Sequence, residues 1–313
     1  MQPVILDVDM GVDDALAIIM ALRSPEIELL GISTVFGNVS LDQATRNALQ
    51  VLELMKRDEV PVYVGASEPL ERVRVHAEAV HGKSGLGDAI LPDPKMLPMG
   101  NALDFLVAAV EARPGEVVVV ATGPLTNLAL VEKRHPGILA QVRRIVVMGG
   151  ALVEVGNMTP VSEFNSFADP HALRRLIEVE TNMTLVPLDL THQLGISADQ
   201  VGARLKGRDD PIARFLLTAM RAVIAFEKEH YNYAGMHLHD PAAVAIAVDP
   251  SLCQIENFSL DVETSGELTT GQVVVDRRPL YRVEEREGYP VDCAMEIDVE
   301  RFMQVFFHRV LGL

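Results

Sequence analysis

Cysteine is scarce in this chain of 313 residues. Only Cys253 and Cys293 are present, and two cysteines are too few for a disulfide framework or a thiolate metal site. A reducing compartment suits such a sequence. We therefore expect the fold to depend on an apolar core, which a chain with 49% hydrophobic residues can supply.

Positive charge is also in short supply. The chain has 27 Lys and Arg against 44 Asp and Glu, which gives a net charge of −17, and its pI is near 4.9. A surface of this sign repels phosphate backbones and anionic membranes, so nucleic acid and lipid are poor partners. A cation or a neutral small molecule fits the charge better.

Long apolar runs and targeting signals are missing. No run reaches the roughly 18 residues of a membrane span. The start, MQPVILDVDM, lacks a basic region and enters a strand pattern at once. These features predict a cytoplasmic protein that does not cross a membrane. The sequence also has no internal repeat or low-complexity linker, which predicts one domain over residues 1–313.

Short β-branched runs alternate with helical stretches up to about residue 190. Several runs are continuously apolar, as in a parallel sheet covered on both faces. The predicted strands are 3–9, 27–35, 60–65, 116–123, 143–150 and 183–189, and the predicted helices between them are 13–24, 41–57, 101–113, 124–134 and 169–180. This alternation predicts an α/β fold with a doubly wound, mostly parallel open sheet and right-handed crossovers.

The rest of the chain adds C-terminal helices and a hairpin. Helices are predicted at 210–230, 239–249 and 299–313, and a β-hairpin at 259–276. The segment 75–94, VHAEAVHGKSGLGDAILPDP, is the most glycine-rich surface stretch, and we expect it to be a mobile loop.

Polar residues gather where the predicted strands end. The aspartates of LDVDMGVDD stand at the end of the first strand, and short motifs stand at the ends of three later strands: Gly37-Asn38, Thr122-Gly123-Pro124 and Met148-Gly149-Gly150. Ligands of doubly wound sheets bind beyond the carboxyl ends of the strands. We therefore expect a binding site at this edge.

Asp7, Asp9, Asp13 and Asp14 concentrate negative charge within eight positions. The helix dipole stabilises each charge by about 0.3–1 kcal/mol, whereas two like charges about 4 Å apart repel by roughly 4 kcal/mol at an effective dielectric near 20. Helix capping and solvation explain one such aspartate better than four. The group therefore needs a shared proton or a cation, and oxygen ligands favour Ca²⁺ or Mg²⁺ over Zn²⁺.

Other polar residues have two interpretations each. Asp240 in HLHDPAAVAIA is a candidate ligand, but Asp followed by Pro is also an ordinary helix start. Glu163 and Asn165 in GNMTPVSEFNSFADP can be turn residues before the next helix. His81 and His239 can equally be surface histidines or satisfied core histidines.

Seven motifs together resemble the inosine-uridine-preferring nucleoside hydrolase family, the nucleoside N-ribohydrolases. In order, and at about the family's spacing, they are DVDMGVDDA, VFGN, HGKSGLGD, ATGPLTNLA, VVMGGA, GNMTPVSEFNSFADP and HDPAAVA. The resemblance spans nearly the whole chain. It implies the nucleoside hydrolase fold and hydrolysis of the N-glycosidic bond of ribonucleosides to free base and ribose.

The resemblance also implies roles for individual residues. A single Ca²⁺ would be held by Asp9, Asp14, the backbone carbonyl of Thr122 and Asp240. The ribose would contact Asp13 and Asn38 near the metal, Asn157, Glu163 and Asn165 on the 3′ and 5′ side, and Met148. The base would lie near His81 and Phe164, His239 would assist the leaving group, and Asp7 would orient its neighbours. The family further implies a homotetramer or homodimer.

The implied reaction fits these residue types. Cleavage builds positive charge on the sugar, which a carboxylate-rich site stabilises. A calcium-bound water is acidified, and Asp9 can take its proton as general base. Direct attack by water predicts inversion at the anomeric carbon. Groups that bind the sugar hydroxyls predict a strong preference for ribosides over deoxyribosides.

The base preference depends on the helix before EKEH. In purine-accepting relatives we expect tyrosines there, whereas this chain has Ala222 and Phe226. A hydroxyl relay to a purine is therefore in doubt, although Tyr231 and Tyr233 follow and could substitute. The sequence slightly favours pyrimidine ribonucleosides.

Two other functions share parts of the pattern. A haloacid-dehalogenase-type phosphohydrolase also begins with a strand ending in D-x-D, but Gly11 stands where that family has Thr or Val. A non-catalytic calcium-binding module shares D-x-D-x-G with the EF-hand loop, but Ile18 stands where that loop has Glu. Phosphate release would favour the first, and calcium binding without hydrolysis the second.

Overall fold

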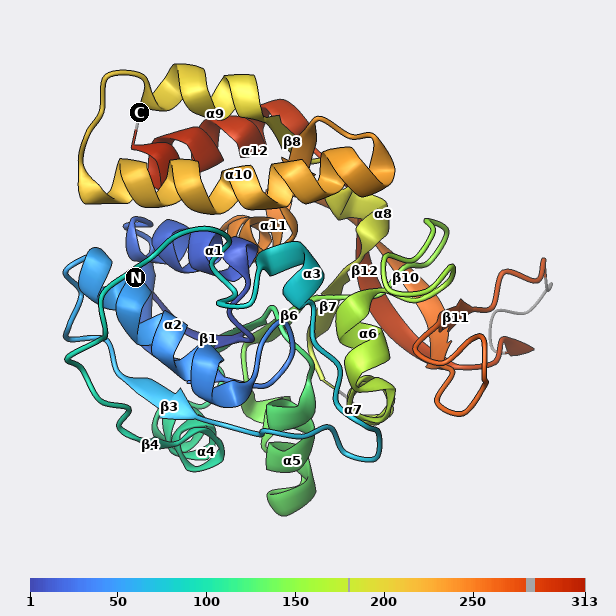
Figure 1. Ribbon diagram of the computed structural model, residues 1–313. Coiled ribbons are helices and arrows are strands. Elements are labelled where there is room, and N and C mark those ends of the chain that lie inside the picture. The colour runs from blue at the N-terminus through green and yellow to red at the C-terminus, as the bar shows by residue number, and fades with distance from the viewer. Residues whose placement is uncertain (180, 280–284, 313) are drawn as a thin grey trace.

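The apolar runs of the sequence form the parallel part of one large sheet (Figure 1). The computed structural model describes residues 1–179, 181–279 and 285–312. The six predicted strands are confirmed as β1 (Gln2–Val8), β2 (Ile27–Thr34), β3 (Val62–Val64), β5 (Val118–Ala121), β6 (Arg144–Met148) and β7 (Met183–Val186). The central strands are buried because helices cover both sides of the sheet.

Four further strands extend the sheet at its two ends. They are β4 (Gly100–Asn101), β10 (Cys253–Val262), β11 (Val273–Val275) and β12 (Tyr289–Ile297). The strand order is β11-β10-β12-β7-β6-β5-β1-β2-β3-β4. All neighbours from β12 to β4 are parallel, and β10 is antiparallel to β12 and β11. The carboxyl ends of β1, β2, β5 and β6 therefore meet at one edge.

The C-terminal strands confirm one prediction and add a strand that the sequence does not predict. Pairing of Leu260 with Val275 confirms the hairpin at 259–276. β12 lies between β10 and β7, antiparallel to the first and parallel to the second. Its position depends on partners far away in the sequence, so the local pattern gives little indication of it.

Helices cover both faces of the sheet, and each face has its own apolar core. One face carries α1 (Val12–Leu22), α2 (Leu41–Leu54), α11 (His239–Val248) and α12 (Val299–Phe306). The other carries α4 (Ala102–Ala112), α5 (Thr126–Arg134) and α7 (Pro170–Ile177). Figure 1 shows the two sets on opposite sides of the strands, which confirms the doubly wound architecture.

A further layer of helices lies over α1 and α11 (Figure 1). It contains α9 (Ala198–Leu205) and α10 (Pro211–Tyr231), with a small sheet of β8 (Gly195–Ser197) and β9 (Gly235–His237) beside them. Asp210 caps α10 by accepting the N–H of Ala213 at 3.0 Å, and Asn232, with φ of 53°, ends the helix. The helix predicted at 210–230 is confirmed.

Several predicted helices differ at their ends; the helix predicted at 41–57, for example, is α2, which ends at Leu54. The helix predicted at 169–180 is α7, which ends at Ile177 and follows the short α6 (Phe164–Ala168). The helix predicted at 299–313 is α12 followed by a π-helical turn over Phe307–Leu311. Residues 180 and 313 of these predictions lie outside the described residues. The remaining short elements are α3 (Glu78–His81), α8 (Leu188–Thr191) and 3-10 turns at Leu139–Gln141 and Pro250–Leu252.

The segment 75–94 is tied to helix α2. The Asn47 amide donates to the carbonyl of Ser84 at 2.6 Å, and the Gln50 amide donates to the carbonyl of Pro92 at 2.7 Å. His81 and Leu86 are buried. The expected mobility of this segment stays a prediction.

One finding bears on membranes: in the described part of the chain, no helix is both long enough and apolar enough to span a bilayer.

Candidate active site

A tight turn between β1 and α1 brings the aspartates to the carboxyl edge of the sheet. Met10 adopts φ of 57°, a left-handed conformation that is unusual for a residue with a side chain. Gly11 follows as the N-cap of α1. A Cβ on Gly11 would lie 2.6 Å from the Asn38 side-chain nitrogen, so the turn requires glycine there. The turn places Asp13 and Asp14 in the first helical turn.

Asp9 is held by the residue that follows β2. Its Oδ2 accepts the backbone N–H of Asn38 at 2.7 Å, and its Oδ1 accepts the Asn38 side-chain amide at 3.0 Å. Gly37 permits this approach, because a Cβ on Gly37 would overlap Asp9 Oδ2. Asn38 therefore contacts the carboxylates directly, and its predicted contact with ribose stays a prediction.

Asp14 connects three segments of the site. Its Oδ1 accepts the Thr122 hydroxyl at 2.6 Å, and its Oδ2 accepts the Gly11 N–H at 2.7 Å. The Asn38 amide also reaches Asp14 Oδ2 at 3.3 Å. The strand ends of β1, β2 and β5 are thus tied together through one carboxylate.

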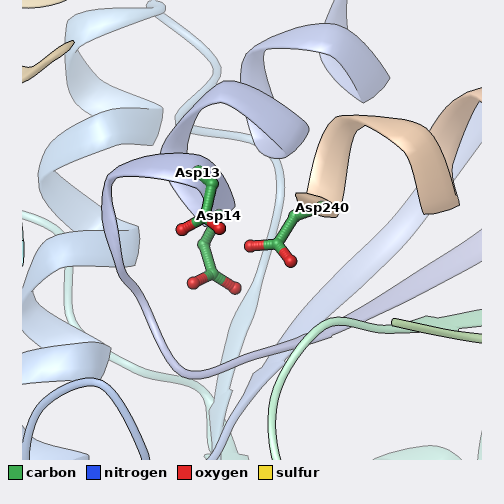
Figure 2. Close-up of side chains that lie close together, drawn as sticks. All are labelled: Asp13, Asp14 and Asp240. Atoms are coloured by element: carbon green, nitrogen blue, oxygen red, sulfur yellow. The ribbon is translucent and has the colours of Figure 1, made fainter. Parts of the chain in front are cut away.

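Asp13, Asp14 and Asp240 form the acidic trio, in which each residue offers an oxygen within 4.8 Å of the others. Figure 2 shows Asp240 reaching from α11 toward the two aspartates of α1. The N-cap of α11 is Leu238. Asp240 is therefore not the N-cap of this helix, as the alternative interpretation of the Asp-Pro pair would have it. Asp240 faces the site, and the trio could hold a metal ion. Asp9 lies beside Asp14 but outside the trio.

Burial makes these carboxylates hard to ionise. It is the largest cause that raises the pKa of Asp13 and of Asp14 to about 6 and the pKa of Asp9 and of Asp240 well above the ordinary range. Neighbouring carboxylates add to the effect: Asp14 raises the pKa of Asp9, and Asp13 raises that of Asp14 and Asp240. A cation would remove this penalty by favouring the charged forms.

Three buried oxygens in and behind the site have no hydrogen-bond partner among the described residues: Asp13 Oδ1, Asn165 Oδ1 and, within β1, Asp7 Oδ2. The Asn165 side-chain amide itself donates to the backbone carbonyls of Thr122 at 2.7 Å and Met148 at 3.2 Å. Unpartnered buried polar atoms are rare and costly, so they indicate a missing ligand. Unpaired oxygens beside an oxygen-only set of donors fit a hard cation and a ligand with hydroxyl groups.

Asp7 supports the site from within β1. Its Oδ1 accepts the Asn127 amide at 2.7 Å and the Ser33 hydroxyl, and its backbone carbonyl accepts the Thr122 N–H at 2.8 Å. Burial raises the pKa of Asp7 to about 6. These contacts link β1 to β2, β5 and α5, so Asp7 is placed to orient its neighbours.

Glu163 is the N-cap of helix α6, which agrees with its interpretation as a turn residue before a helix. Its Oε1 accepts the N–H of Asn165 at 2.8 Å, and its Oε2 accepts those of Gly150 at 3.0 Å and Ser166 at 2.9 Å. Burial raises its pKa. Both oxygens are thus engaged in fixing the loop after β6, and the direct contact between Glu163 and ribose stays a prediction.

The other residues predicted around the ribose and base lie at different depths. Met148 is buried at the end of β6. Phe164 packs against an apolar cluster that contains Val35 and Phe36. Asn157 is exposed and accepts the N–H of Phe164 at 2.9 Å. Asn157 therefore lies at the surface end of the loop, and its contact with ribose stays a prediction.

The two predicted histidines are close to the site and neutral in character. His81 Nδ1 accepts the N–H of Val12 at 3.2 Å and lies 3.8 Å from Asp13 Oδ1. Burial lowers the pKa of His81 to about 4. His239 Nδ1 hydrogen-bonds with the Thr191 hydroxyl at 2.8 Å. Burial, followed by nearby histidines, lowers the pKa of His239 well below its ordinary value.

The structure adds residues that the sequence analysis missed. His237 lies with its ring centre 5.7 Å from that of His239, and His192 lies 4.7 Å from His237. Tyr233, which the sequence did suggest as a substitute phenol, stacks on His237 at 4.6 Å. His237 ends β9 and His239 begins α11. In the sequence they stand two apart, a spacing that in an extended segment puts side chains on one face and could have indicated the pair. His192 comes from another segment and gave no such signal.

Neither Ala222 nor Phe226, the two residues of α10 considered in the sequence, is the one that lies beside His237. Phe226 stacks on His230 at 4.0 Å, and Ala222 faces the turn at Gly87. Glu227 instead lies 3.9 Å from His237, measured between Oε2 and Nδ1. The residue of α10 that lies beside His237 is therefore acidic.

Comparison with known proteins confirms the family resemblance. The family model for inosine-uridine preferring nucleoside hydrolase matches residues 4–304. The chain is 38% identical over 302 residues to a pyrimidine-specific ribonucleoside hydrolase, RihA, of Shewanella woodyi, which covers 96% of this chain and 94% of the relative. It is 37% identical over 311 residues to uridine nucleosidase 1 of Arabidopsis thaliana, with 97% and 91% covered. A solved structure of a purine-preferring ribonucleoside hydrolase from Gardnerella vaginalis matches with a TM-score of 0.91 at 34% identity, covering 99% of this chain and 98% of that one.

Proposed function

Because the chain belongs to the inosine-uridine preferring nucleoside hydrolase family, we propose that its carboxylate site hydrolyses the N-glycosidic bond of ribonucleosides and prefers pyrimidine ribonucleosides. The chain is accordingly an N-glycosyl hydrolase, whose products are free base and ribose. The observation that carries the proposal is the acidic trio, whose Asp13 Oδ1 lies buried without a partner among the described residues beside the equally unpaired Asn165 Oδ1.

Calcium is the proposed cation. Asp14 and Asp240 supply carboxylate oxygens, and Asp13 lies within the same 4.8 Å group. Asp9 and the carbonyl of Thr122 are the other proposed ligands. An oxygen-only set suits Ca²⁺ better than Zn²⁺. When bound, the ion would neutralise the carboxylates, hold sugar hydroxyls and acidify a water molecule.

Asp9 is the proposed general base. Its two hydrogen bonds from Asn38 fix the carboxylate, and burial raises its pKa, which makes it a stronger base than an exposed aspartate. As the bond between C1′ and the base breaks, positive charge grows on the ribose ring, and the buried carboxylates stabilise that charge. Water attacks C1′ and gives a proton to Asp9. Direct attack inverts the configuration at C1′.

The sugar hydroxyls are the proposed partners of the unpaired oxygens. Asp13 Oδ1 and Asn165 Oδ1 can each accept a hydroxyl hydrogen, so a riboside would satisfy atoms that a deoxyriboside leaves unpaired. The further proposed contacts are Asn38, Met148, Asn157 and Glu163 for the ribose, His81 and Phe164 for the base, and His239 for the leaving group.

Two kinds of observation support the preference for pyrimidines. Relatives named for pyrimidine ribonucleosides and for uridine align over nearly the whole chain. The solved structure named for purines has the same fold, so the fold does not separate the two classes. Ala222 and Phe226 on α10 offer no phenol to a purine, which favours pyrimidines, whereas Tyr233 beside His237 is the phenol that could substitute.

The test is to incubate the purified protein with each common ribonucleoside, with and without a chelator, and to measure released base and ribose. We expect release from uridine and cytidine that stops in chelator and returns with Ca²⁺. Inosine turnover more than tenfold above uridine would reject the pyrimidine preference while leaving the hydrolase assignment intact.

The same protein tests the two alternatives. Phosphate release from a panel of phosphorylated substrates, without base release from nucleosides, would favour a phosphohydrolase. Tight calcium binding without any hydrolysis would favour a non-catalytic module. Membership of the family argues against both.

An assembly of two or four copies and a cytoplasmic location complete the proposal. The assembly is supported by the family resemblance, and light scattering at micromolar concentration would measure it. The location is supported by Cys253 and Cys293, which are both free thiols in the structure.

A further inference from the structure

Glu227 is the one acidic side chain of α10 that turns inward near the end of the helix. Its side chain is 13% exposed, and its Oε2 lies 3.9 Å from His237 Nδ1. Its neighbours point elsewhere: Phe226 stacks on His230, and Lys228 donates to Asn232 at 2.7 Å. The exposed Glu229 lies two residues further along the same helix.

The surroundings of Glu227 place it beside His81 and His237, on the side of the carboxylate site that is proposed for the base. Helix α10 packs against α3, which carries His81, and against β9, which carries His237 (Figure 1). Burial, followed by the carboxylate of Asp13, raises the pKa of Glu227 to about 7. Asp13 belongs to the acidic trio, so Glu227 lies close enough to the trio to be affected by its charge.

We propose that Glu227 is the proton donor to the departing base, held in position by His237. This inference rests on the proposed function. The bond between C1′ and the base nitrogen breaks, and its electron pair goes to the base. The proton of the Glu227 carboxyl passes to the base, on a ring nitrogen or a carbonyl oxygen. Water forms the new bond to C1′ and loses its proton to Asp9, so the sum is nucleoside plus water giving ribose plus neutral base.

The protonation states near Glu227 suit this role. Burial, followed by His192, lowers the pKa of His237 to about 4, so near neutral pH His237 is uncharged and does not draw the proton from Glu227. Five ionisable groups interact electrostatically with Glu227. They are Asp13 of α1, His237 of β9, His230 and Tyr231 of α10, and Tyr233 in the turn that follows α10.

His239 is the other group on this side, and one of its two ring nitrogens is already engaged. Its Nδ1 hydrogen-bonds with the Thr191 hydroxyl at 2.8 Å. The carboxyl of Glu227 makes no hydrogen bond among the described residues, only the 3.9 Å approach to His237, so it is the less constrained donor. His239 then orients the base, while Glu227 supplies the proton.

The experiment compares Glu227→Gln and Glu227→Ala with the control Glu229→Gln on two substrates, uridine and p-nitrophenyl riboside. The nitrophenol leaving group needs no proton, so only uridine depends on an acid. We expect Glu227→Gln to lower kcat for uridine by about 100-fold or more and to leave kcat for p-nitrophenyl riboside within about threefold of the wild-type value.

The dependence of kcat on pH is a second readout. Wild-type kcat for uridine should fall as the pH rises above the pKa of Glu227, and the Gln variant should lose this alkaline limb. Glu229→Gln should behave as wild type.

Equal losses on both substrates, or an alkaline limb that survives in Glu227→Gln, would overturn the assignment. Glutamine keeps the shape of the side chain, so a folding failure of the Ala variant does not decide the result. Wild-type protein that cleaves neither substrate would refute the proposed function itself, and the assignment with it.

Discussion

Asn38 contacts both carboxylate oxygens of Asp9, one through its backbone N–H at 2.7 Å and the other through its side-chain amide at 3.0 Å. Two donors from one residue fix the plane of a buried carboxylate. The residue that is proposed to take a proton from water therefore cannot rotate freely, and its base strength is used in one orientation only.

Removal of the Asn38 side chain should loosen Asp9 without removing it. Asn38→Ala keeps the backbone bond and loses the amide, so we expect kcat for uridine to fall by about 10- to 100-fold, the usual effect of losing a group that orients a catalytic residue. Steady-state kinetics measures this. Asn257→Ala is a matched control, because the exposed Asn257 donates to Asp292 at 2.8 Å far from the site. An unchanged kcat in Asn38→Ala would contradict the orienting role.

Asp14 should be indispensable for both metal binding and turnover. It belongs to the trio and also accepts hydrogen bonds from Thr122 and Gly11. We expect Asp14→Ala to lose calcium binding in titration calorimetry and to lower turnover by several orders of magnitude. Asp42→Asn is the control, since Asp42 occupies the first turn of α2 in the same way but is exposed. Full activity of Asp14→Ala in excess chelator would show that the metal assignment is wrong.

The sugar should be recognised more strictly than the base. The unpaired Asp13 Oδ1 and Asn165 Oδ1 need hydroxyl partners, so kcat/KM for 2′-deoxyuridine should be lower than for uridine by at least about 100-fold. Substrates without the 5′ hydroxyl should lose kcat as well as affinity, because remote binding energy orients the reacting carbon. Equal kcat/KM for uridine and 2′-deoxyuridine would sink this part of the account.

Glu227 should make the folded protein less stable as the pH rises. Its pKa is raised from 4.5 to about 7 in the folded state, so between these values the folded state binds more protons than the unfolded state, and the free energy of unfolding falls with rising pH. Glu227→Gln lacks this penalty. Between pH 5 and pH 8, the free energy of unfolding of Glu227→Gln should therefore rise by up to about 3 kcal/mol relative to that of the wild type.

Urea unfolding followed by circular dichroism at the two pH values measures the difference, with calcium held constant and Glu229→Gln as control. A gap between Glu227→Gln and wild type that does not change with pH would mean that Glu227 ionises normally.

The sequence indicates the layers of the fold better than the pairing of late strands. β1, β5 and β6 were predictable because each contains a buried run of consecutive apolar residues. β12 was not, since its place between β10 and β7 is set by partners that lie elsewhere in the chain. The hairpin of β10 and β11 lies within a single short segment, so its turn signal was visible.

The site shows the same division. Convergence of Asp13 and Asp14 follows from their place at a strand end and helix start, and the structure adds Asp240 to them. The residue of α10 that faces the site could not be chosen in this way. One position along a helix rotates a side chain by about 100°, and the packing of α10 on β9 selects Glu227 rather than Phe226. The rotation of α10 about its axis, and so the choice of the residue that faces the site, is a property of the tertiary fold.

The most direct test of the central claim is proton NMR of uridine incubated with the wild-type protein and calcium. The account predicts that uracil and ribose appear together in equal amounts, and that the first ribose formed is the α anomer, because water attacks the carbon opposite the departing base. Uridine that stays intact would contradict the hydrolase assignment, and β-ribose as the first product would contradict direct attack by water at the carboxylate site.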